Sequence, residues 1–347
     1  MAVGIRLPVK PPFPPMEAAT AETIPSGGGW LYEPKWDGFR CLAFKDGENV
    51  FLQSKNGLPL GRYFPEIVEH VRSIGAKRFV LDGELVVRVD KDLSFEELQN
   101  RLHPAESRVR MLSREHPATY LAFDLLVDDQ GKRLTELPLR ERRKRLEAFA
   151  KKFLPAGDVR LSKATEQERV VAGWFKRVGG ALDGIIAKRL DEPYRSGDRS
   201  AVQKIKKLRT ADCVVGGFRY ASSSKVIGSL LLGLYDKKGL LHHVGFTSGL
   251  ADDERKALVR KLKPLIRQPG FTGRAPGGPS RWSTERSNQW EPLQPKLVVE
   301  VSFDHVSDDR FRHGTRLLRW RPDKSPKQCT MDQMKVAASA SLLQLSS

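Results

Sequence analysis

Residues 33–40 read EPKWDGFR and place a lysine inside a predicted turn. Pro34 directly precedes Lys35, and Gly38 follows three residues later, a pattern typical of a tight, non-helical turn. A lysine held there can present its amine to a pocket. Lysine is a nucleophile only in its neutral form, which burial or neighbouring cations favour. Taken alone, the stretch is more often a surface turn with ordinary charges, so the rest of the chain must decide.

The composition predicts a basic globular protein of about two domains. At roughly 150 residues per domain, 347 residues suggest two, and 39% hydrophobic residues supply sizeable cores. Sixty Lys and Arg against 42 Asp and Glu give a formal net charge of +18, which favours a polyanionic partner such as nucleic acid without saying which kind.

Several classes of protein are excluded by what the sequence lacks. No run of about 18 apolar residues occurs, and the N-terminus has no signal-peptide pattern, so we expect no membrane association. The three cysteines are far apart and form no CxxC motif, which argues against a zinc cluster or a disulfide framework. This cysteine usage fits a reducing cytosol.

Strands and helices are expected to alternate irregularly. The β-rich segments are 80–87, 120–127, 183–188, 230–235 and 297–303. Helices are predicted over 138–153 and 254–264, and after two capping-box patterns that begin at Ser94 and Thr165. The charge run ERRKR at 141–145 is expected to form a solvated helix face.

The character of the chain changes after Lys207. Residues 211–347 hold short β-like runs, one helix and a Gly/Pro-rich loop at 270–281, which predicts a small β-barrel of the OB type. We therefore expect one domain over 1–209 and a second over 210–347.

Acidic residues recur in the predicted strands. Asp82 and Glu84 interrupt an apolar strand pattern and should share one face, where they must be solvated, paired, or bound to a cation or sugar hydroxyl. Asp183 and Lys188 are five residues apart and should face opposite sides of a regular strand. Phe123, in another apolar strand, is either core or a ring that stacks on a base.

Two basic clusters suggest phosphate binding. Lys204 and Lys206 should point to one side of a strand, where like charges repel unless an anion lies between them. A second cluster spans residues 316–324. For both clusters, a solvated basic surface is the plain alternative.

The order and spacing of these motifs resemble those of the covalent nucleotidyltransferases, the ATP-dependent DNA ligases and mRNA capping enzymes. The matching motifs are KWDG (35–38), LDGELVV (81–87), YLAFDLLV (120–127), DGIIAKR (183–189), QKIKK (203–207) and RWRPDK (319–324). The resemblance spans about residues 30–334 and is greatest to small two-domain bacterial ligases of the LigC type. It implies an α+β fold, with a nucleotidyltransferase (ATP-grasp-like) adenylation domain followed by the OB-fold domain.

The resemblance also implies a role for each matching residue. Lys35 would become adenylated, Asp37 would lie near the 3′-OH of a nick, and Lys204 and Lys206 would grip the α-phosphate. The expected ATP-binding residues are Glu33 and Phe123 at adenine, Arg40 and Glu84 at the sugar, Lys188, and the trio Arg321, Asp323 and Lys324 at pyrophosphate.

A metal site and a nick contact complete the expected set. Asp183, with Glu84, would position Mg²⁺, for which Mn²⁺ could substitute. Lys55 would touch the nick phosphate. Asp183 replaces the family's usual glutamate, which shortens its reach, and Lys55 replaces an arginine, which loses a bidentate fork.

The implied activity is ATP-dependent sealing of nicks in double-stranded DNA, in repair or end joining. We expect a monomer in the bacterial cytoplasm, associated with the nucleoid, with a Ku-type end-binding protein as a partner known from the family. A hinge is expected near residues 208–212. Three alternatives stay open: a GTP-using mRNA guanylyltransferase, an RNA ligase, and a non-catalytic OB protein that only binds nucleic acid.

Overall fold

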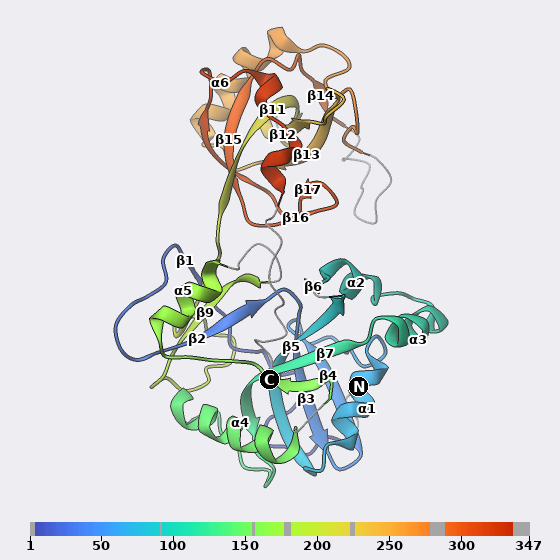
Figure 1. Ribbon diagram of the computed structural model, residues 1–347, viewed down its shortest axis with the longest axis vertical. Helices are drawn as coiled ribbons and strands as arrows, with labels where there is room; N and C mark the ends of the chain where they lie inside the picture. Colours follow the sequence, from blue (N-terminus) through green and yellow to red (C-terminus); the bar gives the residue numbers. More distant parts are fainter. Residues whose placement is uncertain are drawn as a thin grey trace. The chain divides into compact units, whose positions relative to one another are not determined.

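The computed structural model describes residues 4–90, 92–154, 157–176, 182–222, 226–277 and 289–335 (Figure 1). The chain divides after Lys207 into two compact units, the N-terminal unit Met1–Lys207 and the C-terminal unit Leu208–Ala337. Both mix helices with β-sheet. No helix in the described part of the chain combines the length and apolar character that crossing a membrane requires.

The N-terminal unit is built on two β-sheets. The larger sheet has the order β4 (Asn49–Ser54), β3 (Phe39–Asp46), β5 (Arg78–Val89), β7 (Ala118–Val127) and β8 (Val159–Leu161), with β6 (Asp92–Leu93) paired to β5. The smaller sheet has the order β1 (Ala19–Ala21), β10 (Val202–Ile205), β9 (Leu182–Arg189) and β2 (Trp30–Trp36).

Helices cover both sheets. Those described in this unit are α1 (Pro65–Ser73), α2 (Phe95–Asn100), α3 (Glu106–Glu115), α4 (Leu139–Phe153) and α5 (Glu168–Lys176). Helices α1, α2 and α4 pack against the larger sheet, and α5 packs against β9 and β2 of the smaller one. Phe79 of β5 meets Phe149 of α4 edge to face, with ring centroids 5.2 Å apart. Burying such a side chain contributes about 1.5–3 kcal/mol, so contacts of this kind hold α4 to the sheet.

The predicted strands all overlap observed ones, and one of the two predicted helix caps is correct. Ser94 caps α2, with its hydroxyl accepting a hydrogen bond from the backbone N–H of Glu97. The second prediction was wrong, because α5 begins at Glu168 and not at Thr165. Thr165 instead exchanges two backbone hydrogen bonds with Tyr32, so its backbone is used in sheet-like pairing.

The charge run on α4 is not the solvated face that we expected. Arg142 is 2% exposed and Arg143 is 8% exposed. Arg142 forms a bidentate ion pair with Asp124 of β7, at 2.9 and 3.0 Å. A buried guanidinium requires such a partner, and the charge pattern alone does not indicate one.

In the part of the chain that the structure describes, the C-terminal unit is built on one antiparallel β-sheet of six strands. Its order is β13 (Leu241–Thr247), β12 (Ile227–Tyr235), β11 (Arg209–Tyr220), β15 (Val298–Phe303) and β18 (Arg316–Trp320), and β14 (Glu291–Pro292) pairs with β11. Helix α6 (Asp252–Leu262) and the small hairpin of β16 (Val306–Ser307) and β17 (Arg310–Phe311) complete the described elements around it. An isolated bridge joins Thr247 to Thr315, so the two edges of the sheet approach each other at one point.

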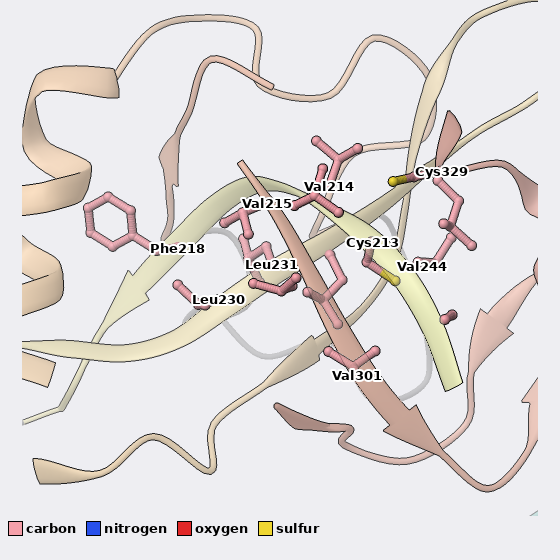
Figure 2. Close-up of a cluster of buried hydrophobic side chains, with 14 of the residues drawn as sticks. Cys213, Val214, Val215, Phe218, Leu230, Leu231, Val244, Val301 and Cys329 are labelled. Carbon is pink, nitrogen blue, oxygen red and sulfur yellow. The ribbon is translucent and has the colours of Figure 1, made fainter. Parts of the chain in front are cut away.

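The core of this unit is formed by apolar side chains that project from the strands of that sheet. Figure 2 shows Val214, Val215 and Phe218 of β11 beside Leu230 and Leu231 of β12. Cys213 and Cys329 are buried in this core, and Cys41 is buried in the N-terminal unit. The Gly/Pro-rich loop predicted over 270–281 lies only partly in the described residues, which end at Gly277 before the next gap.

Candidate active site

A cavity of about 250 Å³ in the N-terminal unit is lined by strands of both sheets. Residues from five of the six matching motifs meet there, although they are spread over some 170 positions of the sequence. The sequence-predicted residues that line it are Glu33, Lys35, Arg40, Lys55, Glu84, Phe123, Lys188 and Lys204.

Lys35 lies in strand β2, one residue before its end, and not in the turn that we expected, because its backbone pairs with Gly184 of β9. Its side chain points to a carboxylate on that neighbouring strand. Its Nζ donates a hydrogen bond to Oδ2 of Asp183, and Nζ of Lys206 lies 3.3 Å from the same oxygen. The side chain of Asp183 is only 8% exposed. One buried carboxylate therefore holds two lysine amines beside the cavity.

An irregularity in the β2–β9 pairing makes this contact. Lys35 pairs with Gly184, but the next residue, Trp36, pairs with Leu182, so Asp183 is an extra residue in β9. Such a bulge redirects a side chain. We expected Asp183 and Lys188 to face opposite sides, as they would in a regular strand. The bulge breaks that rule, because Lys188 lines the cavity and Asp183 reaches the amine of Lys35 beside it.

Two glycines of the motifs allow close backbone approach. A Cβ on Gly38 would lie 2.2 Å from the carbonyl oxygen of Leu85, and one on Gly184 would lie 2.1 Å from that of Ile205. Both distances are impossible for a side chain, so the motifs need glycine here. The result is tight contact of β3 with β5 and of β9 with β10, which brings their site residues together.

A charged pair and an aromatic ring form one part of the cavity wall. Nζ of Lys188 lies 2.8 Å from Oε2 of Glu33, while Oε1 of Glu33 is buried without a hydrogen-bond partner. Above the ring of Phe123 lie Nζ of Lys188, 4.4 Å from its centroid, and the guanidinium of Arg40, at 4.6 Å. Phe123 is thus a cavity residue and not simply core.

The carboxylates of β5 share the cavity but differ in their partners. Asp82 is fully buried and binds the guanidinium of Arg40 through two contacts of 2.6 Å. Glu84 lines the cavity, and burial raises the pKa of its carboxyl to about 7, against the opposing effect of Lys35. Near neutral pH the carboxyl of Glu84 is therefore only partly ionised.

Positive charge gathers around Lys204. Burial lowers the pKa of its amine, and the nearby charges of Lys206, Lys35, Lys55 and Arg199 lower it further. Such a cluster in a cavity wall favours binding of a polyphosphate.

Lys55 and Asp37 occupy different positions around this cavity. Nζ of Lys55 lies 3.3 Å from Oε2 of Glu17, which also contacts Arg199 at 3.2 Å. Asp37 is not among the lining residues, but its charge helps to raise the pKa of Glu84.

Several cavity residues were not predicted from the sequence. They come from the N-terminal segment, from strands β5 and β7, from α4 and from the stretch after β9: Glu17, Asp82, Asp124, Arg142, Glu192 and Tyr194. Asp82 and Asp124 stood out as acids in apolar strands, a signal that could have identified them. Glu17, Arg142 and Tyr194 carried no such signal.

The predicted C-terminal trio forms a cluster within its own unit. Arg321 contacts Asp323 at 2.8 Å and Asp212 at 2.9 Å, and Lys324 also binds Asp212. A hydrogen bond from Arg321 lowers the pKa of Asp323 to about 2.

Two family models match the two halves of the chain. A model described as ATP dependent DNA ligase domain matches residues 15–206, and one described as ATP dependent DNA ligase C terminal region matches residues 223–324. The chain belongs to the ATP-dependent DNA ligase family. This result confirms the resemblance found in the motifs and places the enzyme with DNA ligases rather than capping enzymes.

Relatives of this ligase match over nearly its whole length. DNA ligase C1 of Mycolicibacterium smegmatis is 43% identical over 339 residues, covering 94% of this chain and 95% of that protein. DNA ligase C of Mycobacterium tuberculosis is 42% identical over 356 residues, covering 97% and 98%. A solved structure of mycobacterial DNA ligase D complexed with ATP and MES is 27% identical, with a TM-score of 0.50, and covers 92% of this chain and 98% of that one. The use of ATP by this ligase is thereby supported.

Proposed function

We propose that this ligase seals nicks with a 5′-phosphate and a 3′-OH through an AMP group carried covalently on Lys35. The observation that carries this proposal is the place of the Lys35 amine. It lies in the wall of a nucleotide-sized cavity, hydrogen-bonded to Asp183 and surrounded by cations.

In the first step, Nζ of Lys35 attacks the α-phosphorus of ATP. A P–N bond forms, the bond to the pyrophosphate oxygen breaks, and pyrophosphate leaves. Oδ2 of Asp183 already accepts a hydrogen bond from the amine and can hold the proton that it loses. Lys204 and Lys206 neutralise charge on the phosphates, which is the main catalytic need in phosphoryl transfer.

The carboxylates beside Lys35 suit a hydrated Mg²⁺ ion. No group of three or more His, Cys, Asp or Glu side chains that could hold a metal occurs in the described ranges. Mg²⁺ in such enzymes keeps several waters and takes only one or two carboxylates plus substrate phosphates. We assign Asp183 and Glu84 to this task. The ion, or Mn²⁺ in its place, would supply charge neutralisation on the phosphates.

Selection of adenine would rest on Glu33. Its Oε1 atom is a buried acceptor without a partner, and Glu33 lines the cavity together with Phe123. The exocyclic amine of adenine is a donor that can satisfy this oxygen, whereas guanine presents a carbonyl oxygen that a carboxylate repels. Phe123 offers its ring to the base.

We further propose an adenylation domain over 1–209 and an OB-fold domain over 210–347. The approach of the sheet edges at Thr247 and Thr315 supports a barrel of this type. Its Arg321, Asp323 and Lys324 would orient the leaving pyrophosphate. AMP then passes from Lys35 to the 5′-phosphate of the nick, which Lys55 would contact. Finally the 3′-OH, near Asp37, attacks that phosphate and AMP leaves.

The cellular setting is also a proposal. We expect a monomer in the bacterial cytoplasm, near the nucleoid, acting in DNA repair. A Ku-type end-binding protein stays a prediction that rests on the family.

The test is covalent labelling. The protein is first treated with pyrophosphate to remove any bound AMP, then incubated with α-labelled ATP or GTP and Mg²⁺ and denatured. Label from ATP only, absent in Lys35→Ala and retained in Lys144→Ala, an exposed lysine on α4, is expected. Nicked DNA should then remove the label as it is sealed. Label that survives in Lys35→Ala, or that comes from GTP, would overturn the proposal.

A further inference from the structure

The hydroxyl group of Tyr194 links two walls of the ATP cavity. Tyr194 is 5% exposed and follows β9 in the chain. Its Oη donates a hydrogen bond of 2.6 Å to Oδ2 of Asp82, and accepts one of 3.0 Å from the backbone N–H of Met16. One hydroxyl thus joins strand β5 to the N-terminal segment that lines the cavity.

These contacts belong to a closed ring of hydrogen bonds. Asp82 binds Nε and Nη2 of Arg40, and Nη2 of Arg40 also donates to the backbone carbonyl oxygen of Met16 at 3.3 Å. Met16 therefore uses both its N–H and its C=O in the ring, and Tyr194 closes it. Buried networks of this kind fix the orientation of each member when all are satisfied.

Two side chains pack against the ring of Tyr194. The ring of Phe13 stacks on it, with centroids 6.2 Å apart, and the guanidinium of Arg142 lies 5.6 Å from its centroid. Burial and the nearby charge of Asp82 raise the pKa of Tyr194 well above its ordinary value, so the hydroxyl keeps its proton and stays a donor at neutral pH. The packing of Phe13 and Arg142 against the ring therefore sets the direction in which the hydroxyl donates its hydrogen bond.

We infer that Tyr194 is a positioning residue for adenylation, whose hydroxyl holds Asp82 and the cavity wall at residues 15–18 so that Arg40 is fixed at the nucleotide. The inference rests on the function proposed above. Arg40 and the wall meet ATP itself, whereas Tyr194 acts on ATP only through them.

The consequence concerns affinity more than chemistry. Removal of the hydroxyl leaves the Arg40–Asp82 pair intact, but Met16 loses its acceptor and Asp82 loses one donor. Arg40 and the cavity wall must then become ordered when ATP binds, which costs binding free energy. The KM for ATP therefore rises while kcat changes little. Sealing of nicks that already carry AMP should be less affected, because that AMP is tethered to bound DNA.

Tyr194→Phe and Tyr120→Phe form a matched pair for the test. Tyr120 is buried like Tyr194, and its hydroxyl lies 2.9 Å from the carbonyl oxygen of Cys41 and 3.0 Å from that of Leu81, but it does not line the cavity. For each variant we would measure the melting temperature, the KM and kcat for lysyl-AMP formation, and the sealing of pre-adenylated nicks. We expect the KM for ATP to rise about three- to tenfold in Tyr194→Phe only, with both variants losing some stability.

Two results would overturn the inference: an unchanged KM in Tyr194→Phe, or an equal rise in both variants. If Tyr194→Phe failed to fold, Phe13→Leu would replace it, because this change removes the stacked ring and keeps the hydroxyl. A wild-type KM in Phe13→Leu would support the positioning role of the Tyr194 hydroxyl. A raised KM would indicate instead that packing of the aromatic rings beside the cavity wall determines the KM. Failure of the proposed function is separate, since it would appear as absence of label in the wild-type protein and in Tyr120→Phe.

Discussion

The amine of Lys35 donates a hydrogen bond to the carboxylate of Asp183, which lies 148 positions later in the chain. The two strands that carry them are antiparallel neighbours, and an extra residue in β9 turns Asp183 toward Lys35. The same carboxylate also holds Lys206 at 3.3 Å. Because Asp183 touches both the proposed nucleophile and a proposed phosphate ligand, changes at this carboxylate should act directly on adenylation.

Asp183→Asn should slow lysyl-AMP formation by about 10²-fold or more, since the amide can neither hold the proton from Lys35 nor bind a cation as a carboxylate does. Rapid-quench labelling with α-labelled ATP measures the rate. Asp183→Glu is the control, because it keeps the carboxylate and should stay close to wild type. An asparagine variant as fast as wild type would contradict the role of the carboxylate.

Glu33→Gln should weaken selection between ATP and GTP. The amide of glutamine can donate to the carbonyl oxygen of guanine, which the carboxylate repels, so the ratio of kcat/KM values should fall about tenfold or more. Glu17→Gln is the control, since Glu17 also lines the cavity but contacts Lys55 and Arg199. An unchanged ratio in Glu33→Gln would mean that another group reads the base.

Glu84→Gln should change how stability depends on pH. The pKa of Glu84 is raised to about 7 in the folded protein from an ordinary 4.5, so the folded state binds its proton more tightly than the unfolded state. The contribution of Glu84 to the free energy of unfolding therefore falls as pH rises from about 4.5 to 7 and then levels off. The variant should match wild type at about pH 5 and exceed it at pH 8 by on the order of 1–3 kcal/mol, measured by urea unfolding. An equal difference in the free energy of unfolding between the variant and the wild type at pH 5 and at pH 8 would refute this.

Arg142→Met should destabilise the N-terminal unit strongly. Both Arg142 and Asp124 are almost fully buried, and loss of the arginine leaves an unpaired buried carboxylate, at a cost of about 3–5 kcal/mol. Lys144→Met, at an exposed position of the same helix, should have little effect. The double variant Arg142→Met with Asp124→Leu should recover much of the loss. Equal stability of Arg142→Met and Lys144→Met would show that the pair contributes nothing.

Arg321→Ala should reduce adenylation more than sealing. If Arg321 orients pyrophosphate, its loss should slow lysyl-AMP formation about tenfold or more and leave sealing of pre-adenylated nicks close to wild type. Arg319→Ala is the control, because Arg319 lies two residues before Arg321, near the end of β18, is exposed and pairs with Glu300 at 2.6 Å. Equal losses in the two reactions would remove the proposed division of labour.

Much of this protein could be predicted from local patterns. The strands overlap their predicted segments, and the motifs around Lys35, Glu84, Phe123 and Lys204 led to the family that the comparisons confirm. Such patterns survive in the sequence because the strand period and the glycine requirements act on neighbouring residues.

Other features had no local signal. Arg142 stands in a charge run that is usually solvated, yet it is buried because α4 packs over an aspartate on β7. Tyr194 and the segment around Met16 meet only when chain parts 178 positions apart come together. Long-range partners of this kind are set by the packing of whole elements, which no short window of sequence contains.

By itself the sequence determined the family, the strands that carry Glu84, Phe123 and Lys188, and eight of the side chains that line the cavity. Only the tertiary structure decided how those side chains are paired. Strand periodicity predicts the face on which a residue lies, but one extra residue in β9 redirects Asp183 and overrides that rule. The same is true of the hydrogen-bond ring through Tyr194, because a buried network exists only where sheet, helix and N-terminal segment bring its donors and acceptors together.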